Sequence, residues 1–110
     1  MKERKKILWH VVLISFLPET PTEVREKILA RYETIWSDCG GVDAGIQYFL
    51  VKANLDLRKG VHLVEVAIFD DDDVLQRFRV HPKHCELTEM LRTAANWQVG
   101  DMEDIVLLPL

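Results

Sequence analysis

The chain has 110 residues, of which 48% are hydrophobic and 29% charged, and its formal net charge is −4. This length suits one domain and is too short for two domains with separate cores. The ordinary balance of apolar and charged residues excludes a disordered chain, and the negative charge argues against a basic nucleic-acid-binding surface.

At the N-terminus we expect a basic tail over residues 1–7, followed by a domain over residues 8–110. The apolar run Ile7–Leu17 resembles the core of a signal peptide, but helix-start residues follow it and leave no small-residue cleavage site. The run is also shorter than the roughly 20 residues that cross a bilayer. We therefore predict no membrane contact and a cytoplasmic protein in which Cys39 and Cys85 are free thiols.

The first strand is predicted at Val11–Phe16, which is rich in β-branched and large apolar residues. A helix follows, with Thr20 as its N-cap, Pro21 at the first helical position and Glu23 completing a capping box. Gly40 ends this helix, because glycine readily adopts the left-handed conformation found after a helix. The apolar stripe of the helix consists of Val24, Ile28, Tyr32, Ile35 and Trp36.

The remaining elements complete a ferredoxin-like α+β fold. In chain order they are strands over residues 42–54 and 61–69, a short helix capped by Asp70–Asp73, a helical segment over residues 82–95 and a strand over residues 97–108. Alternation in the second strand places Ile46, Tyr48 and Leu50 on one face. The order β-α-β-β-α-β is that of the ferredoxin-like arrangement, in which helices cover one face of the sheet.

The sheet face without helices is expected to carry apolar side chains, among them Trp9, Leu13, Leu63 and Phe69. An uncovered apolar face in a soluble chain implies a partner. A symmetric homodimer that joins two such faces is the commonest solution.

Two strand histidines are expected to face a cavity on the helix side. His10 and His62 share the strand parity of four branched apolar residues, Val12, Ile14, Val64 and Val66. If these positions line the cavity, both imidazole rings project toward it. The alternative for each ring is a buried histidine that bonds to backbone or neighbouring groups.

The segment His81-Pro82-Lys83-His84 indicates chemistry at a helix junction. Pro82 suits the first helical position, which makes His81 the N-cap. The positive end of the helix favours a neutral imidazole at His84, and a neutral imidazole can accept a proton at pH 7. The alternative for His84 is a structural role through hydrogen bonds to backbone. Tyr32 is a core position whose hydroxyl, if buried, needs a partner that a ligand could provide.

No metal, cofactor or thiol chemistry is predicted. His81, His84 and Cys85 do not form a recognisable zinc pattern. The acidic run Asp70–Asp73 is expected to cap a helix rather than bind a cation. Cys85 cannot pair with the adjacent His84, because neighbours in sequence do not face each other on a helix.

The ordered set of these motifs resembles the stress-responsive A/B barrel family, also called the Dabb or dimeric α/β-barrel domain. The matching segments are the strands His10–Leu13 and His62–Val66, the acidic helix start after Phe69, and His81–His84. The resemblance covers about residues 9–106. It implies a homodimer whose two sheets form a barrel, with a cavity between the helices and the sheet of each subunit.

One plant member of this family, olivetolic acid cyclase, closes a linear polyketide by aldol condensation. The resemblance implies that His84 corresponds to its catalytic base, and that His10 and Tyr32 correspond to a pocket histidine and a pocket tyrosine. Phe78 stands where the cyclase has its other catalytic tyrosine, so the hydroxyl that would hold the base or the substrate is missing.

Two functions of different classes are therefore predicted as alternatives. The first is a small cofactor-independent enzyme in which His84 removes a proton next to the carbonyl of a small apolar molecule, while Tyr32 or His10 hydrogen-bonds the enolate oxygen. Cyclase, isomerase and lyase reactions all begin with that step. The second is a non-catalytic, stress-associated dimer that binds a small apolar ligand. The residues expected to contact the ligand are His62, Val12, Ile14, Val64, Val66, Phe78 and His81.

Overall fold

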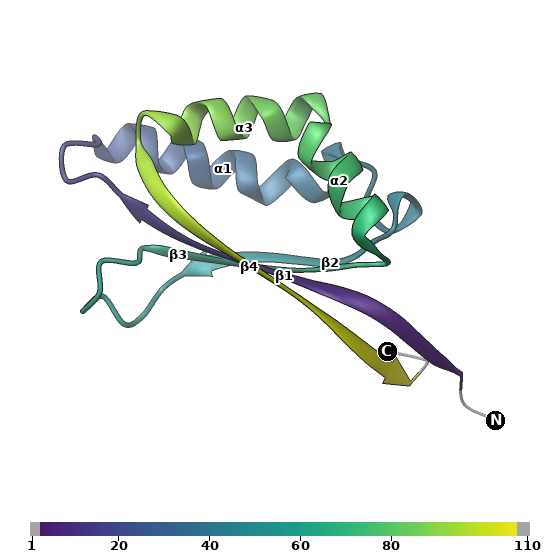
Figure 1. The fold of residues 1–110 in the computed structure, drawn as a ribbon. Coiled ribbons are helices and arrows are strands. Elements are labelled where there is room, and N and C mark those ends of the chain that lie inside the picture. The colour runs from purple at the N-terminus through teal and green to yellow at the C-terminus, as the bar shows by residue number, and fades with distance from the viewer. Residues whose placement is uncertain (1–2, 108–110) are drawn as a thin grey trace.

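The computed structural model describes residues 3–107. It consists of one antiparallel sheet with helices on a single face (Figure 1). In chain order the elements are β1 (Arg4–Phe16), α1 (Thr22–Asp38), the 3₁₀ helix η1 (Gly41–Ala44), β2 (Ile46–Ala53), β3 (Leu63–Phe69), α2 (Asp72–Val80), α3 (Pro82–Arg92) and β4 (Ala95–Leu107). The strand order β2-β3-β1-β4 confirms the ferredoxin-like α+β fold. Within the described residues, no helix has the length and apolar character needed to cross a membrane.

Strand β1 pairs antiparallel with β3 on one edge and with β4 on the other. It begins at Arg4, so residues 4–7 belong to the sheet rather than to the predicted basic tail. Burial explains the difference, because the side chain of Ile7 is only 1% exposed and Lys5 Nζ lies 2.7 Å from Asp70 Oδ1. Residues 1 and 2 of the predicted tail and residue 108 of the predicted last strand lie outside the described residues.

Helix α1 starts without the predicted capping box. Its N-cap is Pro21, and no side chain caps it. The hydroxyl of Thr20 instead donates to the backbone oxygen of Ala94 at 2.7 Å, which ties the start of α1 to the turn before β4. The predicted stripe is confirmed, with Ile28, Tyr32 and Ile35 buried and Val24 and Trp36 packed against them.

The two sides of β3 are the reverse of the prediction. Val12 of β1 is the direct partner of Glu65, and directly paired residues lie on the same face of a sheet. Val64 and Val66 therefore face away from the helices, and their predicted place in a cavity is wrong. Alternation shows which residues of one strand share a face, but the pairing between strands decides which face the helices cover. The residues of β3 on the helix side are Leu63, Glu65, Ala67 and Phe69.

Strand β2 contains a β-bulge at Gln47, where the register with β3 shifts between Ile46 and Tyr48. The extra residue reverses the side-chain parity that follows it. Ile46 is buried, but Tyr48 and Leu50 are exposed, so the prediction that all three share a face is wrong. The β2 residues that pack on the core beyond the bulge are Phe49 and Val51.

Gly45, between η1 and β2, has a φ of +89°, and a Cβ there would lie 2.8 Å from Val74 Cγ2 of α2. We expect Gly45→Ala to lower the free energy of unfolding by about 1–3 kcal/mol, because backbone strain and steric overlap both act. Gly100→Ala is the matched control, since a Cβ there meets no atom within 4 Å. Urea denaturation at equal protein concentrations measures both effects. Equal stability of the two variants would contradict the prediction.

Candidate functional site

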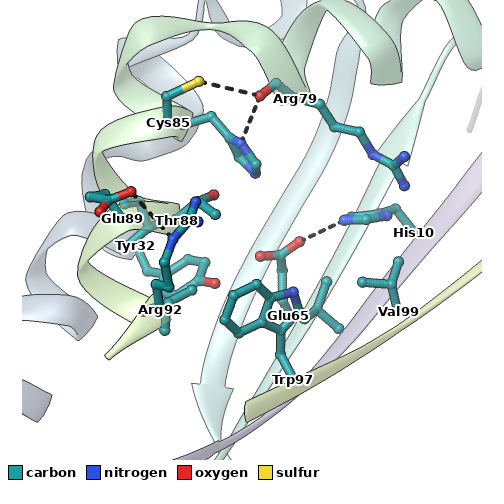
Figure 2. Close-up of a pocket in the computed structure, with 14 residues that line it drawn as sticks. His10, Tyr32, Glu65, Arg79, Cys85, Thr88, Glu89, Arg92, Trp97 and Val99 are labelled. Carbon is teal, nitrogen blue, oxygen red and sulfur yellow. Dashed lines mark hydrogen bonds and ion pairs between the residues drawn. The ribbon is translucent and has the colours of Figure 1, made fainter. Parts of the chain in front are cut away.

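A cavity of about 490 Å³ lies between the sheet and α3 (Figure 2). Four elements supply its central polar side chains, with His10 from β1, Tyr32 from α1, Glu65 from β3 and His84 from α3. Its apolar lining consists of Val12, Leu87, Leu91, Trp97 and Val99. The cavity thus combines charged groups with an apolar wall, whereas the sequence predicted a largely apolar one.

His10 is buried, and both of its ring nitrogens lie beside carboxylates. Nδ1 is 2.6 Å from Asp101 Oδ1, and Nε2 is 3.1 Å from Glu65 Oε2. Burial lowers the pKa of His10, but Glu65 and Asp101 together outweigh burial and raise this pKa above its ordinary value. The two carboxylates favour an imidazolium, which forms an ion pair with each of them, so His10 holds the carboxylates in place.

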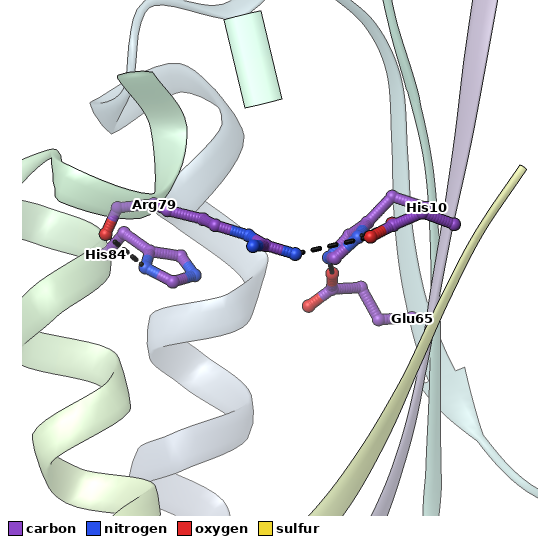
Figure 3. Close-up of polar contacts among 5 residues, drawn as sticks. His10, Glu65, Arg79 and His84 are labelled. Atoms are coloured by element: carbon purple, nitrogen blue, oxygen red, sulfur yellow. Dashed lines mark hydrogen bonds and ion pairs between the residues drawn. The ribbon is translucent and has the colours of Figure 1, made fainter. Parts of the chain in front are cut away.

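The ion pairs of His10 continue to the helical layer. The second carboxylate oxygen of Asp101 accepts a hydrogen bond from Arg79 Nη2, in α2, at 3.2 Å. Negative and positive groups therefore alternate from Glu65 of β3 through His10 of β1 and Asp101 of β4 to Arg79 of α2. Figure 3 shows Arg79 extending from the helical layer toward His10 and Glu65. We call Glu65, His10, Asp101 and Arg79 the charge chain.

His84 lies across the cavity from His10 and Glu65 (Figure 3). Its Nδ1 is 3.1 Å from the backbone oxygen of Arg79, and because a carbonyl oxygen only accepts, Nδ1 carries the proton. Burial lowers the pKa of His84, which favours the neutral ring at pH 7. The unprotonated Nε2 is therefore a proton acceptor at the edge of the cavity. The ring of Phe78 packs on this imidazole with 4.6 Å between ring centroids.

Tyr32 supplies a hydroxyl that points toward the cavity on the side of Glu65 (Figure 2). Burial and the Glu65 carboxylate raise the pKa of Tyr32, so its hydroxyl keeps its proton at neutral pH. Tyr32 can therefore donate a hydrogen bond to an oxygen of a bound molecule.

Of the residues predicted from sequence, four line the cavity: His10, Val12, Tyr32 and His84. His62 does not, because its Nδ1 accepts a hydrogen bond from the backbone N–H of Phe16 at 2.9 Å. His81 caps α3 as predicted, with Nδ1 accepting from the Lys83 backbone N–H at 3.1 Å, and this role keeps it out of the cavity. The other predicted contact residues outside the lining are Ile14, which is fully buried in the core, Val64, Val66 and Phe78.

The sequence analysis did not predict three members of the charge chain as site residues, namely Glu65, Asp101 and Arg79. The signal for Glu65 is a single acidic residue within the apolar strand Leu63–Phe69, which becomes informative once the strand register is known. Asp101 and Arg79 lie among other charged residues and carry no such signal.

Within residues 3–107, no group of three His, Cys, Asp or Glu side chains is arranged to hold a metal ion. Both cysteines are free, as predicted. Burial raises the pKa of Cys39 to about 11, which disfavours its thiolate. Cys85 lines the cavity with its Sγ 3.7 Å from the backbone oxygen of Arg79.

Comparison with known protein families gives one match over most of the chain. The model of the stress-responsive A/B barrel domain matches residues 8–104. No curated protein matches the chain in sequence.

Several solved structures share this fold. A dimeric protein of unknown function from Bacteroides fragilis is 17% identical with a TM-score of 0.73, over 89% of this chain and 96% of that one. The hydroxynitrile lyase from Passiflora edulis is 14% identical with a TM-score of 0.69, over 94% and 96%. SnoaB, a cofactor-independent oxygenase from Streptomyces nogalater, is 16% identical with a TM-score of 0.66, over 96% and 99%. Similarity at these identities establishes the fold alone.

We expect His10 and His84 to titrate on opposite sides of the ordinary histidine pKa of 6.5. Carboxylates raise the pKa of His10, whereas burial lowers that of His84. NMR titration of the imidazole C–H signals, assigned with His10→Gln and His84→Gln, measures both midpoints. A midpoint for His84 above that of His10 is inconsistent with this arrangement.

The raised pKa of His10 also predicts the pH dependence of stability. Its protonation stabilises the folded state fully below pH 6.5, and this stabilisation is lost as the pH rises through the raised pKa. The difference in unfolding free energy between the parent protein and His10→Gln should therefore shrink from pH 6.5 upward. Urea denaturation at a series of pH values tests this, and a difference that stays constant or grows with pH refutes it.

Proposed function

Because the chain belongs to the stress-responsive A/B barrel domain family, we propose that it is a small cofactor-independent enzyme that moves a proton on a carbonyl compound. One observation carries the proposal: a neutral His84 presents its unprotonated Nε2 to the same cavity as the protonated hydroxyl of Tyr32. A proton acceptor and a hydrogen-bond donor that face one space are the two groups that enolisation needs.

His84 is the proposed base. Its Nδ1–H donates to the backbone oxygen of Arg79, which holds the ring in the tautomer that leaves Nε2 available. Nε2 accepts the proton from the carbon next to the carbonyl, and the ring becomes an imidazolium. The negative charge of Glu65 favours that cation. The ring of Phe78 keeps the base in position by packing.

Tyr32 is the proposed donor to the oxygen on which negative charge develops. Its raised pKa suits this role, since the hydroxyl stays protonated while it donates. His10, an alternative donor, has both ring nitrogens beside carboxylates and therefore acts as a positioning residue for Glu65 and Asp101.

By the sequence resemblance, the proposed base corresponds to the base of olivetolic acid cyclase. Phe78 provides no hydroxyl beside His84. We therefore propose that this chain and the cyclase have proton removal by a histidine in common, but not the cyclisation. A lyase and a cofactor-independent oxygenase among the proteins of this fold support an enzymatic use of the cavity.

We also propose that two copies of the chain pair through the sheet face without helices. This face carries partly exposed apolar side chains from three strands, namely Trp9, Val11, Leu13, Tyr48, Leu50, Val64 and Val66. Apolar sheet faces of this kind are stable when covered, and a two-fold pairing covers both at once. The dimeric protein from Bacteroides fragilis with the same fold supports this assembly.

Hydrogen–deuterium exchange tests the proton transfer with acetophenone as probe. We expect the protein to catalyse deuterium uptake at the methyl carbon in D₂O, measured by proton NMR. His84→Gln should slow this exchange by about 100-fold or more, since general base catalysis contributes that much. Tyr32→Phe should slow it by roughly 100-fold through loss of the oxygen donor.

His81→Asn is the control for the exchange experiment, because His81 lies outside the cavity lining and asparagine also caps a helix. Its exchange rate should equal that of the parent. If acetophenone binds but the parent shows no exchange, the chain is instead a non-catalytic ligand-binding dimer. Full activity in His84→Gln would rule out His84 as the base.

A further inference from the structure

Glu65 is a carboxylate in an unusually buried position, with its side chain 5% exposed. Oε2 accepts no hydrogen bond from any residue between 3 and 107, although His10 Nε2 lies 3.1 Å away as an ion pair. Leaving a buried carboxylate oxygen without a hydrogen bond is costly in free energy. The carboxylate also borders the cavity, so a molecule bound there lies within its reach (Figure 2).

The charges around Glu65 limit the chemistry of that molecule. In the charge chain, the positive His10 and Arg79 balance the negative Glu65 and Asp101. A cationic ligand would add an uncompensated positive charge, and an anionic ligand would be repelled by Glu65. A neutral hydrogen-bond donor satisfies the carboxylate and preserves the balance, and a hydroxyl group is such a donor.

The other polar groups of the cavity indicate which further chemical groups the ligand carries. Tyr32 donates and therefore suits a carbonyl oxygen, whereas His84 Nε2 accepts and faces the acidic carbon. Neither of them donates a hydrogen bond to Glu65 Oε2 in the structure. A ligand that satisfies all three residues carries a carbonyl group and a separate hydroxyl group.

We propose that Glu65 binds a hydroxyl group of the substrate, so that the cavity selects hydroxylated carbonyl compounds over otherwise identical compounds without the hydroxyl. The inference rests on the proposed function, because it takes the substrate to be a carbonyl compound. Glu65 is then a specificity-determining residue, and His10 is the positioning residue that holds it.

Calorimetric titration of the parent protein with 2-hydroxyacetophenone and acetophenone measures this selectivity. We expect the hydroxylated ketone to bind about 10-fold more tightly or better, because a hydrogen bond to a charged group lowers the dissociation constant by that factor. Glu65→Gln should reduce the ratio of the two dissociation constants to about threefold or less, since the amide is uncharged. Glu86→Gln should leave the ratio unchanged, because Glu86 is an exposed α3 residue paired with Arg31 at 3.0 Å.

Glu65→Asp provides a second variant if the amide destabilises the fold. It keeps the negative charge but withdraws the carboxylate by one methylene, so the ratio should again fall. A ratio near one in the parent protein overturns the inference without any variant. In that case, loss of deuterium exchange in His84→Gln leaves the proposed function standing. Absence of both binding and exchange with either ketone overturns the proposed function and the inference together.

Discussion

The double pairing of β1 determines how the polar residues on the sheet, His10, Glu65 and Asp101, lie relative to one another. One edge of β1 places Val12 opposite Glu65, and the other edge places His10 opposite Asp101. His10 and Val12 share the helix-facing side, so both carboxylates come to lie beside one imidazole. A shift of either pairing by one residue would turn a carboxylate to the opposite face of the sheet. The charge chain is thus a direct consequence of strand register.

Two histidines of the same cavity acquire opposite properties from their surroundings. His10 lies between two carboxylates and favours its charged form, whereas His84 is half-buried with a backbone oxygen at Nδ1 and favours its neutral form. Groups whose pKa values are displaced in opposite directions can divide acid, base and positioning roles at one pH. The neutral ring is the one that presents a nitrogen to the cavity, which is why we place the base there.

The junction between α2 and α3 connects this chemistry to the fold. His81 caps α3, and the backbone just before it, at Arg79, accepts the hydrogen bond from His84. The side chain of Arg79 also donates to Asp101, so one residue orients the base and completes the charge chain. Phe78, next to Arg79, packs on the imidazole. A short helical turn thereby positions groups on both sides of the cavity.

Local sequence patterns determined the order of strands and helices, the cap at His81 and three of the polar cavity residues, His10, Tyr32 and His84. These features depend on neighbours a few residues apart, which periodicity and capping preferences describe well. Only the tertiary structure decided that Glu65 rather than Val64 faces the helices, and that Asp101 and Arg79 join it. Alternation along a strand leaves open which of its two faces is covered, and pairing between distant strands settles that choice.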